Sequence, residues 1–536
     1  MEHLDMRKKI TIMIAVVSVL LFSALNMTIV GTSLPKIVSE IGGLDYFEWV
    51  FTIYMLTSSI TAILVGKLSD IYGRKIFLQV GIIIFSIGSL LSGFSTDIIE
   101  LIIYRGIQGF GGGMLMSISF ATVGDLFSPR ERGRWQGILG GTFGLASLLG
   151  PTLGGYIVDN FDWSWVFWVF LPFGVIAFVL ISRLYPKKEI TEKESVDYLG
   201  SLVLSLTLIS LLLAFTWADT KYDWLSFEII GLFSLSLASL IAFIFIELKV
   251  KSPVVPLFLF KNSVFTVSNI VSFLIGVGMF SVIMYVPFFV QGVVGASATT
   301  SGLVEMAMTI AMVISSGTAG YLITKTGKYK VMAIIGLSIM TVGIFLNTTL
   351  TADSTLLNVI LNLVVVGLGL GVTFPVFNLT VQNAVQHKFL GVATATSQLF
   401  REIGGTVGVA VMGSIMGRRL VQKLEEAEMP PVGSANGGEM PADLEKLQDP
   451  QLLMNPDALA EIKASIPEQM QGFFDQFIDL MRESLSFALS GVFTFSAIVV
   501  AIAVLATFFL KEIPLRTSNE DPDEEEENKG KVVQGT

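Results

Sequence analysis

Three charged residues lie inside long apolar stretches of this sequence: Arg105, Glu305 and Glu402. A charged side chain costs roughly 2.5 to 3.5 kcal/mol at the centre of a bilayer, so such residues are retained for a function. Because burial disfavours the ionised carboxylate, Glu305 and Glu402 are candidates to bind a proton on one side of a membrane and release it on the other. We expect Arg105 to assist this coupling by holding a carboxylate or backbone carbonyl groups. The structural alternatives are an interfacial position for Glu305, an ion pair for Glu402 and a helix anchor for Arg105.

A second charged cluster is the segment 66–75, Gly-Lys-Leu-Ser-Asp-Ile-Tyr-Gly-Arg-Lys. Its glycines suit a close turn between two helices, and Asp70 and Arg74 supply charges that can pair. Asp125, at the inner end of a later helix, is a further partner for Arg74. Ion pairs of this kind hold one conformation and break in another, so we predict a conformational latch. The alternative is that the basic residues only mark the cytoplasmic side.

Other chemistry has little support in the sequence. The chain has no cysteine and two histidines, His3 and His387, which lie far apart. The glycine run 109–113 has no preceding strand, so it indicates helix packing rather than a phosphate-binding loop. We expect no catalytic residues, no metal and no cofactor, with the proton motive force as the energy source.

The whole chain has the composition of a membrane protein. Of its 536 residues 52% are hydrophobic and 15% are charged, which leaves too little polar surface for a soluble protein of this size. We find fourteen apolar stretches of about 20 residues, the length that crosses a ~30 Å hydrocarbon layer. Basic loops alternate with loops nearly free of Lys and Arg, so the positive-inside rule places both termini in the cytoplasm.

The segment 66–75 has a weaker copy at 320–329. Subtracting 66 from 320 gives an offset of 254 residues. The same offset aligns further glycines: Gly113 with Gly367, Gly137 with Gly391, Gly150 with Gly404, and Gly154 with Gly408. Two repeats running in the same direction in an apolar chain indicate two similar membrane halves around a central site. This arrangement is typical of a transporter.

The predicted fold is an all-α integral membrane protein with fourteen transmembrane helices, built as two six-helix bundles plus an inserted helix pair. The expected boundaries are 1–196 for the first bundle, 197–262 for the inserted pair and linker, 263–510 for the second bundle, 417–484 for a large outer loop within it, and 511–536 for a disordered acidic cytoplasmic tail. In that loop, residues 469–483 carry Met and Phe at helical spacing and predict an amphipathic helix. It would dock on the outer face, rest on the outer leaflet or guard a side opening.

Three motifs give the chain a resemblance to a known family. They are the segment 66–75, the run Arg105-Gly106-Ile107-Gln108-Gly109, and a fifth-helix run with Gly137, Gly150, Pro151, Gly154 and Gly155. With them the chain resembles the major facilitator superfamily, and within it the fourteen-helix drug:proton antiporters. The fifth-helix motif is typical of the antiporters, although Ala146 stands where a glycine is usual. From the residues alone, Gly150 and Gly154 predict a tight helix contact and Pro151 a bend, which could form a gate or only pack.

The resemblance implies proton-coupled multidrug efflux of lipophilic or amphipathic compounds by alternating access. It implies a monomer in the plasma membrane, with no nucleic-acid partner and with antibiotic resistance as a consequence. Asn26 departs from the family, which usually has an aspartate there, and this shifts the expected proton coupling to Glu305 and Glu402. The candidate substrate-binding residues are Asn26, Gln108, Phe280, Tyr285 and Asn378. The alternatives are a dedicated exporter of an endogenous lipid, fatty acid or metabolite and, more distantly, a receptor or scaffold that transports nothing.

Overall fold

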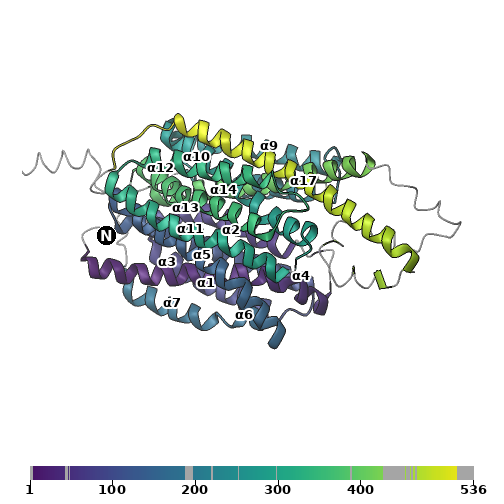
Figure 1. Ribbon diagram of the computed structural model, residues 1–536. Helices are drawn as coiled ribbons and strands as arrows, with labels where there is room; N and C mark the ends of the chain where they lie inside the picture. Colours follow the sequence, from purple (N-terminus) through teal and green to yellow (C-terminus); the bar gives the residue numbers. More distant parts are fainter. Residues whose placement is uncertain are drawn as a thin grey trace, which may run out of the picture.

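The computed structural model describes most of the chain. The described residues are 4–42, 46, 49–186, 197–218, 221–250, 253–296, 298–386, 389–426, 453, 459, 463–464 and 468–515. Within them every named element is a helix, which confirms the all-α prediction. Figure 1 shows these helices running side by side along one direction, with the start of α1 and the end of α17 at the same end of the bundle.

The described part of the first half contains seven helices. They are α1 (Met6–Ile41), α2 (Trp49–Tyr72), α3 (Arg74–Ser92), α4 (Ile98–Leu126), α5 (Pro129–Asn160), the short α6 (Trp165–Trp168) and α7 (Leu171–Leu184). Polar residues start two of them, because the first N–H groups of a helix need acceptors. Asp97 accepts from the backbone N–H groups of Ile99 and Glu100, and Ser128 forms a capping box with Glu131.

Two helices follow the first half as an inserted pair: α8 (Tyr198–Trp217) and α9 (Phe227–Glu247). They pack on each other, and α8 also contacts α2 of the first half and α14 of the second. Leu204 and Leu208 of α8 share an apolar cluster with Leu56 of α2 and Leu399 of α14. The inserted pair therefore lies against the seam between the two halves.

The second half begins with a short 3₁₀ helix. Its elements are η2 (Leu257–Lys261), α10 (Ser263–Phe288), the π-helical turn η3 (Phe289–Val293), α11 (Ala298–Thr326), α12 (Tyr329–Asn347), α13 (Leu356–Asn383), α14 (Leu390–Glu426) and α17 (Glu468–Phe508). The helices α14 and α17 extend into both ends of the expected loop 417–484. The helix expected over 469–483 is the beginning of α17 rather than a separate element. Its apolar face is buried at Phe474, Ile478 and Met481, so the amphipathic pattern marks packing onto the protein.

Thirteen of the described helical segments are long and apolar enough to cross a membrane, with α6 and α7 counted as one segment. The 29-residue α4, which contains Arg105, Gln108 and a run of glycines, is not among them. It nevertheless lies inside the first half, packed against α2 and α3. Together these segments supply the fourteen helices that the sequence predicts.

The two copies of the repeated segment form the same type of turn. The first joins α2 to α3 at Gly73 and the second joins α11 to α12 at Gly327, with φ angles of 91° and 71°. Residues with a Cβ rarely adopt such angles, which explains the glycine at both places. We call the end of the bundle that carries these turns the motif end, and the opposite end the far end.

Candidate functional site

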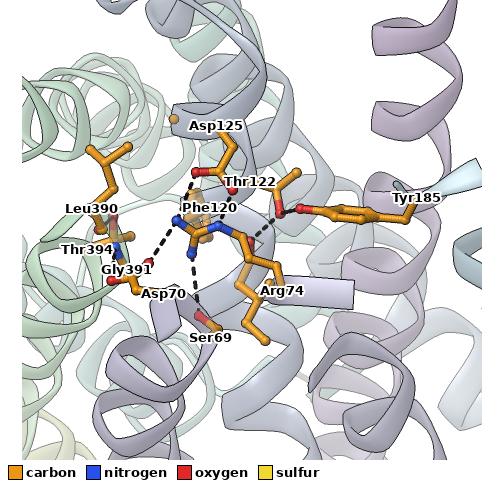
Figure 2. A network of polar contacts seen from close by, with 12 residues as sticks. Ser69, Asp70, Arg74, Phe120, Thr122, Asp125, Tyr185, Leu390, Gly391 and Thr394 are labelled. Atoms are coloured by element: carbon orange, nitrogen blue, oxygen red, sulfur yellow. Dashed lines mark hydrogen bonds and ion pairs between the residues drawn. The ribbon is translucent and has the colours of Figure 1, made fainter. Parts of the chain in front are cut away.

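The three residues of the predicted latch lie together at the motif end (Figure 2). Arg74 Nη2 lies 3.0 Å from Asp70 Oδ1 and 3.0 Å from Asp125 Oδ1, and Arg74 Nε also donates to Asp125. Each of the three side chains is less than a tenth exposed. Buried charges are stable only when paired, so this arrangement depends strongly on the guanidinium group.

Asp70 also reaches across to the second half. Its Oδ2 accepts from the backbone N–H groups of Gly391, at 3.1 Å, and Val392, at 3.4 Å, in the first turn of α14. The positive end of the α14 helix dipole also stabilises the Asp70 carboxylate. The cluster therefore belongs to both halves at once.

Glycines allow this approach of α2 to α14. A Cβ atom on Gly66 would lie 3.0 Å from the carbonyl oxygen of Gly391, and one on Gly391 would lie 2.6 Å from that of Gly66. A second pair of helices in contact across the halves, α5 and α11, has a similar approach. There a Cβ atom on Gly137 would lie 2.7 Å from the carbonyl oxygen of Ser316. The seam between the halves is thus backbone against backbone at the motif end.

Glu402 forms a second polar contact between the halves. Its Oε2 accepts a hydrogen bond from the hydroxyl group of Ser59 on α2, and its Oε1 accepts from Gln398 Nε2 at 3.0 Å. The neighbouring Arg401 is buried and stacks over the ring of Phe374, 4.3 Å from its centroid. A carboxylate of the second half is therefore held by a donor of the first.

Arg105 lies in a chain of buried polar groups in the first half. Its Nη1 donates to Gln108 Oε1 at 2.6 Å, Gln108 donates to Asn26 Oδ1 at 2.7 Å, and Asn26 donates to Ser89 Oγ at 3.2 Å. The guanidinium group stacks over Tyr54, 4.4 Å from the ring centroid, and its Nη2 has no hydrogen-bond partner. Tyr54 is near enough to both Arg105 and Glu402 to link them in one polar region.

Glu305 lies apart from this region, on α11. Its side chain is partly buried, and its Oε1 is buried without a hydrogen-bond partner. An unpartnered buried oxygen destabilises an ionised carboxylate, since nothing replaces the lost hydration. The structure therefore places the two candidate proton carriers differently: Glu402 at the seam with two donors, and Glu305 with one oxygen unpartnered.

The glycines of α5 allow close contacts with two different helices. Gly137 meets α11 of the second half, whereas a Cβ atom on Gly150 would overlap the hydroxyl group of Thr28 on α1. Gly154 is buried. The side-chain surroundings of Pro151 and Gly155 lie outside the described residues, so the predicted bend stays a prediction.

The five candidate substrate-binding residues are mostly packed. Asn26 and Gln108 are fully buried and bonded to each other, and Asn378 is 4% exposed. Tyr285 donates its hydroxyl to the carbonyl oxygen of Val409 on α14 at 2.9 Å. Phe280 is partly buried and lies against Gly405 of the same helix. A role in binding would require their exposure in another conformation.

Sequence reasoning missed several members of the site. Gln398 lies four residues before Glu402, a spacing at which helical side chains meet, and that pattern could have identified it. Ser59 and the first turn of α14 at Gly391 carry no comparable local signal. In the described part of the chain, no group of three or more His, Asp or Glu residues could hold a metal ion.

Comparison with known proteins gives consistent results. Residues 16–409 match the model of the Major Facilitator Superfamily. The multidrug transporter protein MdtP of Bacillus subtilis (strain 168) is 38% identical over 535 residues, which cover 98% of this chain and 97% of that protein. Multidrug resistance protein 3 of the same organism is 33% identical over 501 residues, covering 94% and 95%.

Solved structures share the fold at low identity. The human organic anion transporter MFSD10 (TETRAN) superposes with a TM-score of 0.58 at 15% identity, covering 92% of this chain and 99% of that one. The proton:xylose symporter XylE, bound to 6-bromo-6-deoxy-D-glucose, gives a TM-score of 0.56 at 15% identity and covers 96% and 98%. At this identity the likeness concerns the fold alone.

Proposed function

Because this chain belongs to the Major Facilitator Superfamily, a family of multi-pass membrane transporters rather than enzymes, we propose that it exports lipophilic or amphipathic compounds in exchange for protons. The multidrug names of two similar proteins from Bacillus subtilis support a range of substrates rather than one. The site of action would be the plasma membrane, with the motif end and both termini in the cytoplasm. Alternating access would expose the central site first to one side and then to the other.

The hydrogen bond between Ser59 and Glu402 carries the proposal. An ionised carboxylate accepts a hydrogen bond about twice as strongly as a neutral group does, so adding a proton to Glu402 weakens its hold on α2. The protonation state of one residue of the second half thereby changes a contact with the first. This is the link that exchange of a proton for a substrate requires.

Glu305 would be the other proton carrier. Its buried, unpartnered Oε1 favours the neutral acid, so the residue would accept a proton from the far end and release it when the conformation changes. Arg105, whose Nη2 lacks a partner, would stabilise the ionised state of nearby acids in the same cycle. A cycle of this kind needs no cofactor.

The latch would act at the motif end. With Asp70 bonded to Gly391 and Val392, the halves are joined there and the conformation closed to the cytoplasm is stabilised. Opening toward the cytoplasm would break these bonds. One proton moving down 100 mV supplies about 2.3 kcal/mol, enough for roughly a forty-fold gradient of a neutral substrate.

The test is substrate-induced proton release from the purified protein in detergent. Cationic dyes, neutral antibiotics and lipids would be added in turn to the wild type, Glu305→Gln and Glu402→Gln, with the exposed Glu228→Gln as control. We expect release by chemically varied drugs, lost in at least one of the two buried variants and intact in the control. Release by one lipid or metabolite alone would indicate a dedicated exporter, and release unchanged in both buried variants would refute the proton-coupling roles.

A further inference from the structure

Two buried carboxyl groups face each other in the inserted helix pair, outside both six-helix bundles. Asp197 precedes α8 and is 7% exposed, and Glu247 ends α9 and is 4% exposed. Asp197 Oδ2 and Glu247 Oε1 both lie within 3.2 Å of the position that a Cβ atom on Gly200 would take. The two distances are 2.2 Å and 3.2 Å, so these two oxygens are at most about 5.4 Å apart.

Each carboxyl group uses one oxygen and leaves the other without a partner. Asp197 Oδ1 accepts from the backbone N–H of Gly200 at 2.8 Å, and Glu247 Oε1 accepts from that of Val254 at 3.1 Å. Asp197 Oδ2 and Glu247 Oε2 are buried and accept no hydrogen bond. Two ionised carboxylates in this position would repel each other, and each would keep a desolvated oxygen.

The described charges around the pair offset only part of the repulsion and desolvation of the two carboxylates. Lys67 of α2, itself buried, acts on Glu247. The first eleven residues of α14, the other helix packed against α8, are uncharged from Leu390 to Phe400. On the chain that follows α9, Lys249 is exposed to solvent. Among the described residues around the pair, one ammonium group therefore faces two carboxylates.

The helix dipoles decide which carboxyl group keeps its charge. Asp197 lies at the N-terminus of α8, where the dipole stabilises an anion, whereas Glu247 lies at the C-terminus of α9, where the dipole destabilises one. The unpartnered Asp197 Oδ2 would be an available acceptor for a proton carried on the unpartnered Oε2 of Glu247. Its Oε1 could still accept from Val254.

We propose that Glu247 and Asp197 form a proton-binding site in the inserted helix pair, with the proton carried on Glu247 and its hydrogen bond accepted by Asp197. The site lies beside Lys67, in the same segment as the latch residues Asp70 and Arg74. Loss of the proton would place a full negative charge next to that segment. The proposal does not depend on the direction of transport or on the substrate.

Infrared difference spectroscopy of the full-length protein in detergent tests this, with pH titration of the carbonyl band of protonated carboxyl groups. We expect Glu247→Gln to remove one titrating group. We expect Asp197→Asn, which removes the repelling charge, to lower the midpoint of that group by about one pH unit, and Lys67→Met to raise it by a similar amount. Glu228→Gln, on the exposed first turn of α9, is the matched control and should leave the midpoint of the Glu247 group unchanged.

Two results would overturn the proposal. One is a titration in which Glu247→Gln loses no group and neither Asp197→Asn nor Lys67→Met moves a midpoint. The other is a band that appears only when sodium is replaced by choline, because the pair would then hold a metal cation. If Glu247→Gln does not fold, the opposite shifts in the Asp197 and Lys67 variants decide the question.

Discussion

The turns at Gly73 and Gly327 occupy equivalent positions in the two halves, but different side chains hold them. Both join two helices through one glycine with a positive φ angle. In the first half, Arg74 pairs with two buried carboxylates, one of which also caps α14 of the other half. The residues 254 positions after Asp70, Arg74 and Asp125 are Thr324, Lys328 and Leu379, which include no acid.

The second turn is held by the chain that follows α17. The hydroxyl group of Tyr329 accepts from the backbone N–H of Ile513 at 2.6 Å and lies 3.3 Å from the carbonyl oxygen of Lys511. Lys330 Nζ donates to the carbonyl oxygen of Phe508 at 2.8 Å. All these contacts stay within the second half.

This difference in contacts suggests that the turn at Gly73 belongs to a conformational switch, whereas the turn at Gly327 is a fixed connection within one half. Contacts between the halves must break and re-form when the halves rock against each other, whereas contacts within one half move as a unit. The first turn is hydrogen-bonded to the opposite half through Asp70, whereas the hydrogen bonds of Tyr329 and Lys330 stay within the second half. A repeated backbone turn therefore does not imply a repeated function.

The largest expected difference between the turns comes from removing their basic residues. Arg74→Met removes the guanidinium group that pairs with the buried Asp70 and Asp125, and breaking a buried ion pair costs about 3 to 5 kcal/mol. The equivalent Lys328 is exposed, so Lys328→Met should change stability by less than about 0.5 kcal/mol. Thermal unfolding in detergent and dye efflux from cells measure both effects, and we expect efflux to fall at least about tenfold only for Arg74→Met. Equal losses in the two variants would contradict the comparison.

A smaller effect should follow from Tyr329→Phe. The variant leaves the backbone N–H of Ile513 without an acceptor, which costs about 1 to 2 kcal/mol of stability. Because the contact lies within one half, the efflux rate per folded molecule should stay within about twofold of the wild type. The control is Tyr321→Phe, on an exposed residue of α11. A large loss of rate with little loss of stability would show that this turn also takes part in switching.

The smallest expected effect is the loss of stability when either turn glycine is replaced by alanine. The two turns should share this effect, because it comes from the backbone conformation. Gly73→Ala and Gly327→Ala should each destabilise the protein by about 1 kcal/mol, because both glycines have positive φ angles. Gly231→Ala, inside α9 and in open space, should cause no loss. The unfolding temperatures of the three variants are the readout. A loss at Gly73 several times that at Gly327 would mean that the charged cluster amplifies the change.

Much of the fold follows from the sequence because its signals are local. The length of each apolar stretch predicts a membrane-spanning helix, and the 254-residue offset predicts two similar halves with an insertion between them. The pairing of Arg74 with Asp125 could be anticipated because both residues lie at helix ends on the same predicted side. The helix over 469–483 was recognised by its spacing, but its continuity with α17 was not.

The sequence by itself determined the class of the protein, the number of its helices and the residue types available for proton transfer. Tertiary structure alone decided that Ser59 meets Glu402, that Asp70 meets the first turn of α14, and that Glu247 faces Asp197. The physical reason is distance along the chain. Hydropathy and helical periodicity act over a few turns, whereas these contacts join residues from 50 to more than 300 positions apart, and only the packing of the helices brings them together.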